Sequence, residues 1–327
     1  MTRLFALLAV TLATLPLPVA AMSVTARIPL ADGGWDYVSV DPASNRLFVA
    51  RGDGVATIDL ATKTVTPRLV AAGRTHAAFI IPGTTIGIVT NTVDSGVMLF
   101  DATTGKVTAD IKTGPKPDAA VYDPATKSLL VMDNQDGSVT IVDPVAGKKT
   151  GSIAVGGALE FAATDGKGHL YVNVEDKNAL AMVDIRSRRV LRTTPLTGCD
   201  EPSGLALTKD GVLISACSNG VAKVTDAKSG KPMADIVIGP RPDAVLYDAA
   251  RDRAYVPSGG DGTLTVIDTK GHAARRIASV ATQKGARTGA VDPATGTVYL
   301  PAARYEAPVG DARPKTVPGS VEMLVIN

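Results

Sequence analysis

Residues 118–155 read DAAVYDPATKSLLVMDNQDGSVTIVDPVAGKKTGSIAV, and they divide into four short β-type segments separated by turn sequences. The segments are residues 118–122, 128–132, 138–142 and 149–155. Asp-Pro, Asp-Gly and a lone Gly stand between them, and these residues favour tight turns. The stretch therefore predicts one antiparallel unit of four strands.

The same unit recurs along the chain, and an Asp at the end of the third strand marks six of its seven copies. Successive Asp residues are 42, 42, 41, 42 and 42 positions apart, and a seventh copy, Val325-Ile326-Asn327, follows Asp268 after 59 residues. A four-stranded repeat of about 40 residues is typical of a propeller blade, and no gap has room for the helices of a parallel sheet. We therefore predict an all-β fold, a seven-bladed β-propeller with four-stranded blades. The marker pairs are Ile58-Asp59, Phe100-Asp101, Val142-Asp143, Val183-Asp184, Thr225-Asp226 and Ile267-Asp268.

Blade 7, in residues 283–327, supplies only three of its four strands, at 289–291, 297–300 and 320–326. Residues 23–30 (SVTARIPL) resemble the fourth-strand segment 106–113 (KVTADIKT). We therefore expect residues 22–32 to join blade 7 and to close the ring, which removes open sheet edges. The expected organisation is a signal peptide at 1–21 and one propeller at 22–327.

The first residues have the order of a secretory signal peptide. A basic start at Arg3 is followed by an apolar run at 4–15 and by small residues up to Ala21. The run is too short to span a bilayer, so we expect cleavage near Ala21 and a periplasmic or secreted protein with no membrane span. The chain has 34 basic and 32 acidic residues, a net charge of +2, and loss of Arg3 would leave +1. This balance gives no general electrostatic case for nucleic acid.

The chain has two Cys residues, Cys199 and Cys217, on the two sides of the hairpin expected in blade 5. An oxidising compartment favours a disulfide between them over two free thiols. Covalent haem attachment through Cys-x-x-Cys-His is excluded, and no nucleotide-binding motif is present. A basic cluster in blade 4 is interpreted as a solvated turn, with a nucleic-acid or polymer contact as the alternative. The cluster consists of Arg186, Arg188, Arg189 and Arg192.

Alignment of the blades by their first strands exposes one position that should lie at the mouth of the central channel in every blade. The side chains at this position should converge on the propeller axis, and four of them are carboxylates. Clustered carboxylates repel one another, which raises pKa values or recruits a cation. Simple solvation of a water-filled channel is the alternative to a ligand site. The channel-mouth ring consists of Asp36, His76, Asp118, Glu160, Ser203 or Glu201, Asp243 and Arg287, with Trp35 beside it as a stacking surface.

A subset of the ring offers candidate ligands for one divalent cation. Oxygen-rich ligation suits Ca²⁺, Mg²⁺ or Mn²⁺ better than Zn²⁺. The other two histidines, His169 and His272, fall in turns expected on the opposite face of the propeller. The candidate metal ligands are His76, Asp118, Glu160 and Asp243.

The extra residues of blade 7 form an insertion at about 302–320, between its second and third strands. Links of this kind open on the same face as the links that enter the first strands, so the insertion should lie beside the ring. Its prolines, Pro308, Pro314 and Pro318, favour a stiff lid or specificity loop, and a loop beside a hydrated channel is the alternative. The candidate lid residues are Arg304, Tyr305, Glu306 and Arg313, with Asp311 and Lys315 nearby.

Several short motifs resemble the YVTN-type β-propeller repeat. They are the second-strand pattern Leu170-Tyr171-Val172-Asn173, the Asp-Pro turns at Asp41, Asp123 and Asp292, and the linker Ile238-Gly239-Pro240-Arg241-Pro242-Asp243. With the expected signal peptide, the chain is similar to the YncE-like periplasmic proteins of that family. The resemblance implies a propeller fold over the whole mature chain. Some members are linked to single-stranded DNA binding and others to cell-surface or redox-associated roles, and no motif here selects among these.

The sequence leaves three functions open, and it does not decide whether the protein is an enzyme. The first is a binding or scaffold propeller that holds a small ligand, glycan, peptide or partner protein on the channel face. The second is a hydrolase or lyase of the metal-dependent lactonase type, in which a central cation would polarise a carbonyl and a ring carboxylate would act as base. The third, single-stranded DNA binding, is implied by the family resemblance alone.

Overall fold

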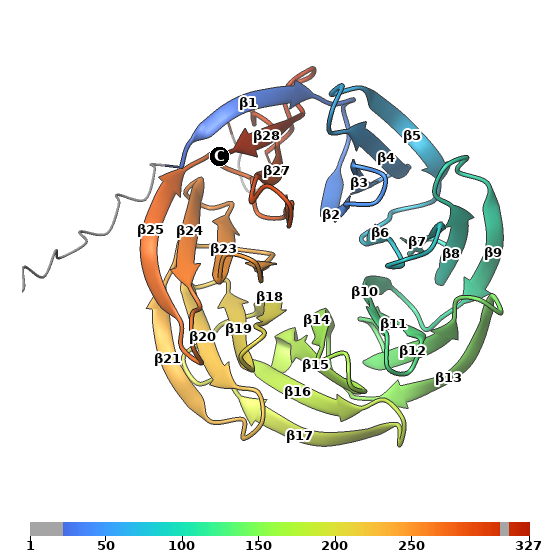
Figure 1. Cartoon of the computed structure of the whole chain (residues 1–327), viewed down its shortest axis with the longest axis vertical. Coiled ribbons are helices and arrows are strands. Elements are labelled where there is room, and N and C mark those ends of the chain that lie inside the picture. The colour runs from blue at the N-terminus through green and yellow to red at the C-terminus, as the bar shows by residue number, and fades with distance from the viewer. Residues whose placement is uncertain (1–21, 308–313) are drawn as a thin grey trace, which may run out of the picture.

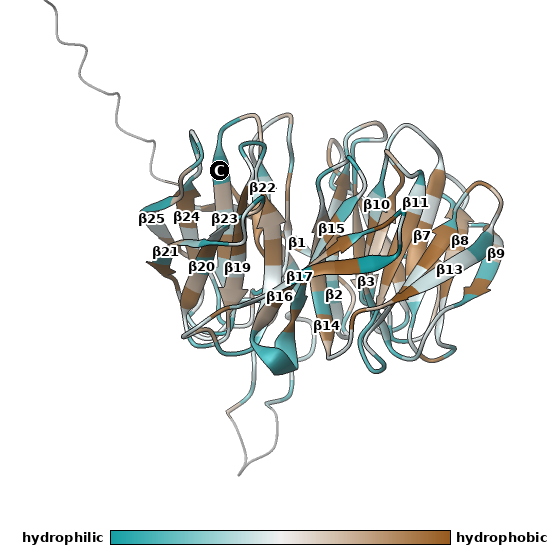
Figure 2. Ribbon diagram, turned by 90° about the horizontal axis from the view of Figure 1, so that it is seen from below, coloured by the Kyte–Doolittle hydropathy of each residue, from teal (hydrophilic) through white to brown (hydrophobic). Residues whose placement is uncertain are grey.

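The seven blades form a closed ring around a central axis in a computed structural model of the chain, which describes residues 22–307 and 314–327 (Figure 1). Seen edge-on, the strands run between the two faces of the disc, and apolar stretches are concentrated along them (Figure 2). The expected signal peptide at 1–21, and Pro308, Asp311 and Arg313 of the insertion, lie outside the described residues.

Each of the first three blades is a four-stranded antiparallel sheet whose strands follow one another from the axis outward. Blade 1 consists of β2 (Trp35–Asp41), β3 (Arg46–Arg51), β4 (Gly54–Asp59) and β5 (Val65–Ala71). Blade 2 consists of β6 (Ala78–Ile80), β7 (Ile86–Asn91), β8 (Gly96–Asp101) and β9 (Val107–Lys112). Blade 3 consists of β10 (Pro117–Asp123), β11 (Ser128–Asp133), β12 (Ser138–Asp143) and β13 (Lys148–Ala154).

Blades 4 to 6 repeat the same order, and blade 7 recruits its outer strand from the other end of the described chain. Blade 4 has β14 (Leu159–Thr164), β15 (His169–Val174), β16 (Ala179–Asp184) and β17 (Arg189–Pro195). Blade 5 has β18 (Pro202–Leu207), β19 (Val212–Cys217), β20 (Val221–Asp226) and β21 (Pro232–Val237). Blade 6 has β22 (Leu246–Asp248), β23 (Arg253–Ser258), β24 (Thr263–Asp268) and β25 (Arg275–Ala281). Blade 7 has β26 (Ala290–Val291), β27 (Val298–Ala302), β28 (Glu322–Ile326) and β1 (Val24–Pro29).

The predicted seven-bladed all-β architecture is therefore confirmed. Helical structure among the described residues is limited to one three-residue 3₁₀ turn, η1 (Glu175–Lys177). No helix in the described part of the chain has the length and apolarity that crossing a membrane requires.

The repeating Asp that marks the blades forms the turn between the third and fourth strands. In blade 2, Asp101 Oδ1 accepts hydrogen bonds from the backbone N–H groups of Thr103 and Thr104, at 3.1 and 2.8 Å. These bonds hold the pKa of Asp101 below its usual range. Gly105 follows at φ 73°, a left-handed conformation that glycine adopts without steric cost. The sequence signature thus reflects an Asp side chain that caps its own turn.

The basic cluster of blade 4 connects backbone segments of adjacent blades. Arg188 donates to the carbonyl of Thr150 in blade 3 at 3.1 Å, and Arg192 donates to the carbonyl of Ala227 in blade 5 at 2.9 Å. Both guanidinium groups are thereby engaged by the protein itself, which favours the structural interpretation of this cluster.

The ring closes through antiparallel pairing of β1 with β28, as expected from the sequence (Figure 1). Val24 pairs with Ile326, and Ile28 pairs with Met323. Ile28 and Leu30 are 6% and 8% exposed and belong to the same buried cluster as Leu47 of blade 1. The closing strand therefore completes blade 7 and also packs against blade 1.

We expect a chain that starts at residue 31 to be much less stable than one that starts at residue 22. Burial of Ile28 and Leu30 alone is worth about 3–6 kcal/mol, and the truncation also leaves β28 with an open edge. Thermal unfolding of the two chains measures the difference, with the exposed-site variant Ala26→Ser as a control. Equal melting temperatures would contradict closure by β1.

The predicted disulfide between Cys199 and Cys217 is confirmed, with a Cα–Cα separation of 5.3 Å. Cys199 lies just before β18, and Cys217 is the last residue of β19, so the bond connects the two inner strands of blade 5 near the channel-mouth face. Both residues are buried, in one cluster with Leu196 and Leu213. The bond closes a loop across a sequence separation of 18 residues.

Replacing both cysteines by Ala should lower the free energy of unfolding by about 3 kcal/mol, the chain-entropy value for a loop of this length. Urea unfolding of the oxidised wild type and of the double variant measures this difference. Reduction of the wild type should give a similar loss, and reduction of the double variant should have no effect. A double variant as stable as the oxidised protein would contradict a stabilising role for the bond.

Candidate functional site

The structure places the predicted ring residues at equivalent positions of the seven blades. Asp36, Asp118, Glu160 and Ser203 are each the second residue of a first strand, β2, β10, β14 and β18. In all four strands the pairing with the second strand is interrupted across this position, so the ring residue is released from the ladder. The remaining ring residues, His76, Asp243 and Arg287, lie just before β6, β22 and β26.

Blade 5 is the blade in which the sequence left two candidates. Ser203 occupies the ring position and donates a hydrogen bond to the Pro242 carbonyl of blade 6 at 3.0 Å. Glu201 lies two residues earlier, is exposed, and has a φ of 48°. Its structural equivalents in other blades also have positive φ values, so this is a separate outer position of the mouth. These equivalents are Arg74, Lys116 and Arg241.

Backbone hydrogen bonds hold neighbouring ring residues together. The N–H groups of His76 and Ala77 both donate to Thr90 Oγ1 at 3.0 Å. The Tyr37 N–H donates to the His76 carbonyl at 3.1 Å, and the Asp243 N–H donates to the Arg287 carbonyl at 3.2 Å. The ring is therefore positioned by contacts between blades as well as by the individual strands.

A compact cluster of three ring side chains occupies the side of the mouth formed by blades 1 to 3. His76 Nδ1 lies 2.6 Å from Asp36 Oδ2 and 3.8 Å from Asp118 Oδ1. One ligand atom from each residue lies within 4.8 Å of the others. Asp118 is 6% exposed, and its carboxylate accepts no hydrogen bond from the described residues. His76 Nε2 is also buried without a hydrogen-bond partner among them.

The other two acidic ring residues have partners of their own. Glu160 Oε1 accepts a hydrogen bond from Asn134 Nδ2 at 2.9 Å, and Asp243 Oδ2 pairs with Arg287 Nε at 3.1 Å. The metal-ligand set expected from the sequence, His76 with Asp118, Glu160 and Asp243, is thus divided in the structure. Asp36 joins His76 and Asp118, whereas Glu160 and Asp243 bind to neighbouring polar groups.

Burial and mutual repulsion favour protonation of Asp118, Glu160 and Asp243. Burial is the main cause for each, and it raises the pKa of Asp118 to about 6, of Asp243 to about 7 and of Glu160 to about 10. The negative charges of Asp118 and of Glu175 in η1 raise the pKa of Glu160 further. Burial alone would lower the pKa of His76, but its hydrogen bond with Asp36 and the charge of Asp118 raise it overall. The mouth is therefore an environment of negative potential that favours protons or other positive charge.

An aromatic pair lies directly beneath the acidic ring. The rings of Tyr37 and Phe161 meet edge to face with centroids 4.9 Å apart. The pKa of Tyr37 is raised by burial and by nearby ring carboxylates, with Asp243 the largest of these. The same two rings line a cavity of about 340 Å³ whose other walls are mainly apolar, including Phe79 and Val121. The pair therefore separates the acidic mouth from an apolar section of the channel.

The aromatic pair was not predicted, although the blade alignment contains a signal for it. The residue after the ring position is small in four other blades and large and aromatic only in blades 1 and 4, where it is Tyr37 and Phe161. The small residues are Ala77, Ala119, Gly204 and Ala244.

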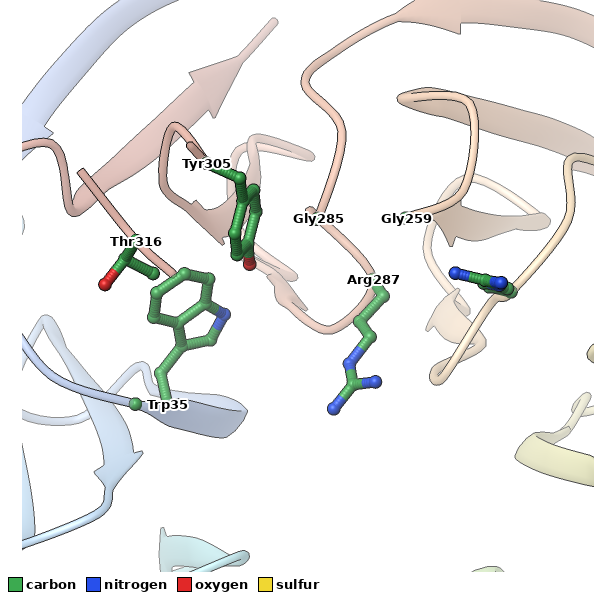
Figure 3. Close-up of a pocket in the computed structure, with 8 residues that line it drawn as sticks. Trp35, Gly259, Gly285, Arg287, Tyr305 and Thr316 are labelled. Carbon is green, nitrogen blue, oxygen red and sulfur yellow. The ribbon is translucent and has the colours of Figure 1, made fainter. Parts of the chain in front are cut away.

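The insertion of blade 7 forms a side pocket of about 300 Å³ against the ring (Figure 3). Tyr305 and Thr316 form an antiparallel bridge at the base of the insertion. Figure 3 shows the Tyr305 hydroxyl, the Trp35 indole and the Arg287 guanidinium around one space. The pocket is lined by Gly34, Trp35, Arg241, Gly259, Gly285, Arg287, Tyr305 and Thr316.

Gly285 sets the position of the Tyr305 ring. Its φ is 89°, and a Cβ added to it would lie 2.5 Å from Tyr305 Cε2. Of the expected lid residues, Tyr305 reaches the pocket, whereas Arg304 and Glu306 are exposed and do not line it. Arg241 does line it and was not predicted as a site residue.

A larger cavity, of about 690 Å³, opens between blades 4 and 5 on the opposite face. Its ionisable groups are largely paired within the protein. His169 Nδ1 lies 2.8 Å from Asp165, and His272 Nε2 lies 2.9 Å from Asp226. Lys209, also in this cavity, forms an ion pair with Asp252 at 2.6 Å. The channel mouth, where the Asp118 carboxylate accepts no hydrogen bond from the described residues, leaves more side-chain groups free to bind a ligand.

The comparisons with known proteins identify the fold class of the chain. No protein-family model and no curated protein matches it. Hydrazine synthase from Kuenenia stuttgartiensis contains a similar chain, with 17% identity, a TM-score of 0.71, and coverage of 83% of this chain and 93% of that one. A chain of the mitotic checkpoint complex has 11% identity, a TM-score of 0.78, and coverage of 99% and 98%. At these identities the likeness extends to the fold alone, and the protein is a seven-bladed β-propeller.

Glu160→Gln should raise stability at neutral pH. The pKa of Glu160 is about 4.5 in the unfolded chain and about 10 in the folded one. Folding therefore becomes less favourable as the pH rises from 4.5 toward 10, because the unfolded chain loses this proton and the folded chain must keep it. Gln resembles the protonated side chain and can still accept the Asn134 hydrogen bond. The gain at pH 7 should be about 3–4 kcal/mol, since each of the roughly 2.5 pH units between 4.5 and 7 is worth ~1.4 kcal/mol.

Urea unfolding at pH 4 and pH 7 measures this gain, which should almost vanish at pH 4. The exposed Glu201→Gln variant is the matched control and should show no comparable gain. If the stability of Glu160→Gln relative to wild type is the same at pH 4 and at pH 7, Glu160 is not held protonated in the folded chain.

Proposed function

We propose that this protein is a periplasmic or secreted binding propeller, which uses the channel mouth to hold a small polar ligand through a positively charged group of that ligand. The observation that carries this proposal is Asp118, a residue only 6% exposed whose carboxylate accepts no hydrogen bond from the described residues. Asp36 already faces His76 at 2.6 Å, whereas Asp118 has only the same imidazole at 3.8 Å. An ammonium group of a ligand would supply the missing donor.

The electrostatics of the mouth support a cationic ligand group. The raised pKa values of Asp118 and Asp243 mean that the site takes up protons more readily than an exposed carboxyl does. A ligand cation can replace this positive charge and keep the buried carboxylates ionised. The aromatic pair Tyr37–Phe161 lies beneath the site and also lines the apolar cavity below it.

The proposed compartment and family rest on the sequence and on the disulfide. The signal-peptide pattern at 1–21 predicts export, and the bond between Cys199 and Cys217 is of a kind that persists in oxidising compartments. The resemblance to YVTN-type, YncE-like propellers is supported by the pattern Leu170-Tyr171-Val172-Asn173. The side chain of Asn173 is buried and donates to the carbonyls of Ser203 and Gly204 in the next blade, at 3.1 and 3.0 Å. This residue type thus has a structural role between blades.

Phenethylamine should bind to the mature chain, and Asp118→Asn should weaken its binding about tenfold, the equivalent of ~1.4 kcal/mol. Binding should be about fourfold tighter at pH 8 than at pH 5.5, because protonation of Asp118 near pH 6 removes the competent form. Isothermal titration calorimetry measures both effects. Asp110→Asn, which changes an exposed Asp on β9, is the control and should bind as wild type does.

Absence of phenethylamine binding, or equal binding by wild type and Asp118→Asn, would overturn the proposed function. Weaker binding at pH 8 than at pH 5.5 would do the same.

A second candidate, a metal-dependent hydrolase or lyase, is favoured by the arrangement of Asp36, His76 and Asp118. Their ligand atoms lie within 4.8 Å of one another, and one nitrogen with two carboxylate oxygens fits a cation such as Mn²⁺. These three residues would hold the metal, which when bound supplies a Lewis acid for a carbonyl substrate. Stoichiometric metal in protein purified without chelator would favour this candidate, and metal-free protein that binds phenethylamine would favour the binding propeller.

A further inference from the structure

The side pocket beside the acidic cluster has the opposite charge preference. Among its eight lining residues, all within the described part of the chain, none is acidic, and two are arginines, Arg241 and Arg287. Trp35 adds an indole N–H group, and Tyr305 adds a hydroxyl that can donate. A pocket lined by hydrogen-bond donors and cationic side chains favours an anion.

The donors of this pocket are largely unused. Arg287 Nε pairs with Asp243 Oδ2 at 3.1 Å, and the Arg287 side chain is 55% exposed. Arg241 is exposed, and its guanidinium has no hydrogen-bond or ion-pair partner in the described ranges 22–307 and 314–327. The indole N–H of Trp35 and the hydroxyl of Tyr305 likewise have none there. Within the described residues, four donor groups are therefore available at one cavity of about 300 Å³.

The shape of the pocket suits a planar group next to the anion. The rings of Trp35 and Tyr305 stand on the same side of the space, and the Arg287 guanidinium faces it from below (Figure 3). A Cβ added at Gly34 would meet nothing within 4 Å, so the wall there is open. Flat aromatic side chains and small residues of this kind leave room for a ring to stack.

The two parts of the mouth are joined by adjacent residues. Trp35 of the side pocket precedes Asp36 of the acidic cluster, and Arg287 of the pocket pairs with Asp243 of the ring. The acidic cluster and the side pocket are therefore contiguous, and a ligand with its cation near Asp36 and Asp118 can extend an anionic group toward the arginines.

We propose that the ligand of this site is a small zwitterion, with its ammonium group at Asp118 and Asp36, its carboxylate at Arg241 and Arg287, and a planar side chain against Trp35 and Tyr305. This inference rests on the proposed function and adds the anionic half of the ligand to it. Amino acids and very short peptides with an aromatic side chain have this combination of groups.

Three probes that share a phenylethyl group separate the contributions. Phenylalanine carries both charges, phenethylamine carries only the ammonium, and 3-phenylpropionate carries only the carboxylate. Calorimetry at pH 7.5 and low salt should show phenylalanine binding to the mature chain at least tenfold more tightly than either of the other two.

One arginine variant tests where the carboxylate binds, and a second serves as its control. Arg241→Gln should weaken phenylalanine binding about tenfold, because it removes one of the two arginines that hold the carboxylate, and it should leave phenethylamine binding unchanged. Arg189→Gln, which changes an exposed arginine on the outer strand β17, is the matched control and should bind all three probes as wild type does. Since Arg241 has no partner in the described ranges, the variant should melt like wild type.

The outcomes distinguish this inference from the proposed function. If phenethylamine binds through Asp118 but phenylalanine is no tighter, or if Arg241→Gln leaves phenylalanine unchanged, the zwitterion is overturned and the cation site stands. If 3-phenylpropionate binds through Arg241 while the ammonium adds nothing, both the zwitterion and the proposed function are overturned. A tenfold advantage of phenylalanine that Arg241→Gln abolishes supports the inference.

Discussion

Closure of the ring by the pairing of β1 with β28 is the constraint on which the rest of the molecule depends. Each blade is a small twisted sheet that buries its faces only against its two neighbours. Once the ring is closed, the number of blades determines how near the inner strands come to the axis. The side chains at the start of those strands must then share one small region, whatever their charges. The acidic mouth is thus a consequence of closure combined with the residue types at one position of the repeat.

Four carboxyl groups around one axis repel one another, and this repulsion disfavours folding. Neighbouring polar groups reduce its cost. Asn134 donates to Glu160, Arg287 pairs with Asp243, and His76 faces Asp36. Asp118 alone among the acidic ring residues lacks such a neighbour at hydrogen-bond distance within the described residues. A residue that costs stability without serving the fold is the expected signature of a binding site, because the missing partner can come from the ligand.

The fold was predictable in detail because its determinants are local and repeated. The Asp at the end of the third strand in blades 1 to 6 caps a turn through its own side chain. Regularly spaced Asp residues therefore make the repeat visible in the sequence. The disulfide was predictable for the same reason, since Cys199 and Cys217 belong to one hairpin. Alignment of the repeats also identified the equivalent positions that form the ring. In blade 5, where the sequence left two candidates, Ser203 occupies this position.

What the sequence did not reveal are the contacts between blades that are distant along the chain. Tyr37 of blade 1 meets Phe161 of blade 4, and their contact across the channel leaves no periodic trace. The division of the ring into a cluster and two separate pairs depends on which neighbour reaches each carboxylate, and Asn134 belongs to a different link from the ring position. Arg241 stands two residues before the ring position, where the blade alignment also places Arg74 and Lys116, and a basic residue shared by several blades does not by itself indicate a pocket in one of them.

The insertion and the ring are in contact at one glycine, Gly285. The Tyr305 ring rests where a side chain of residue 285 would be, and residue 285 stands two positions before Arg287 in the same link. A displacement of the insertion therefore acts on the backbone segment that aims the Arg287 guanidinium. Arg287 in turn pairs with Asp243, whose pKa depends first on burial and then on that guanidinium. The insertion thus reaches the acidic half of the mouth through Gly285, Arg287 and Asp243, so that the aromatic wall, the anion-binding groups and the acidic ring form one connected site.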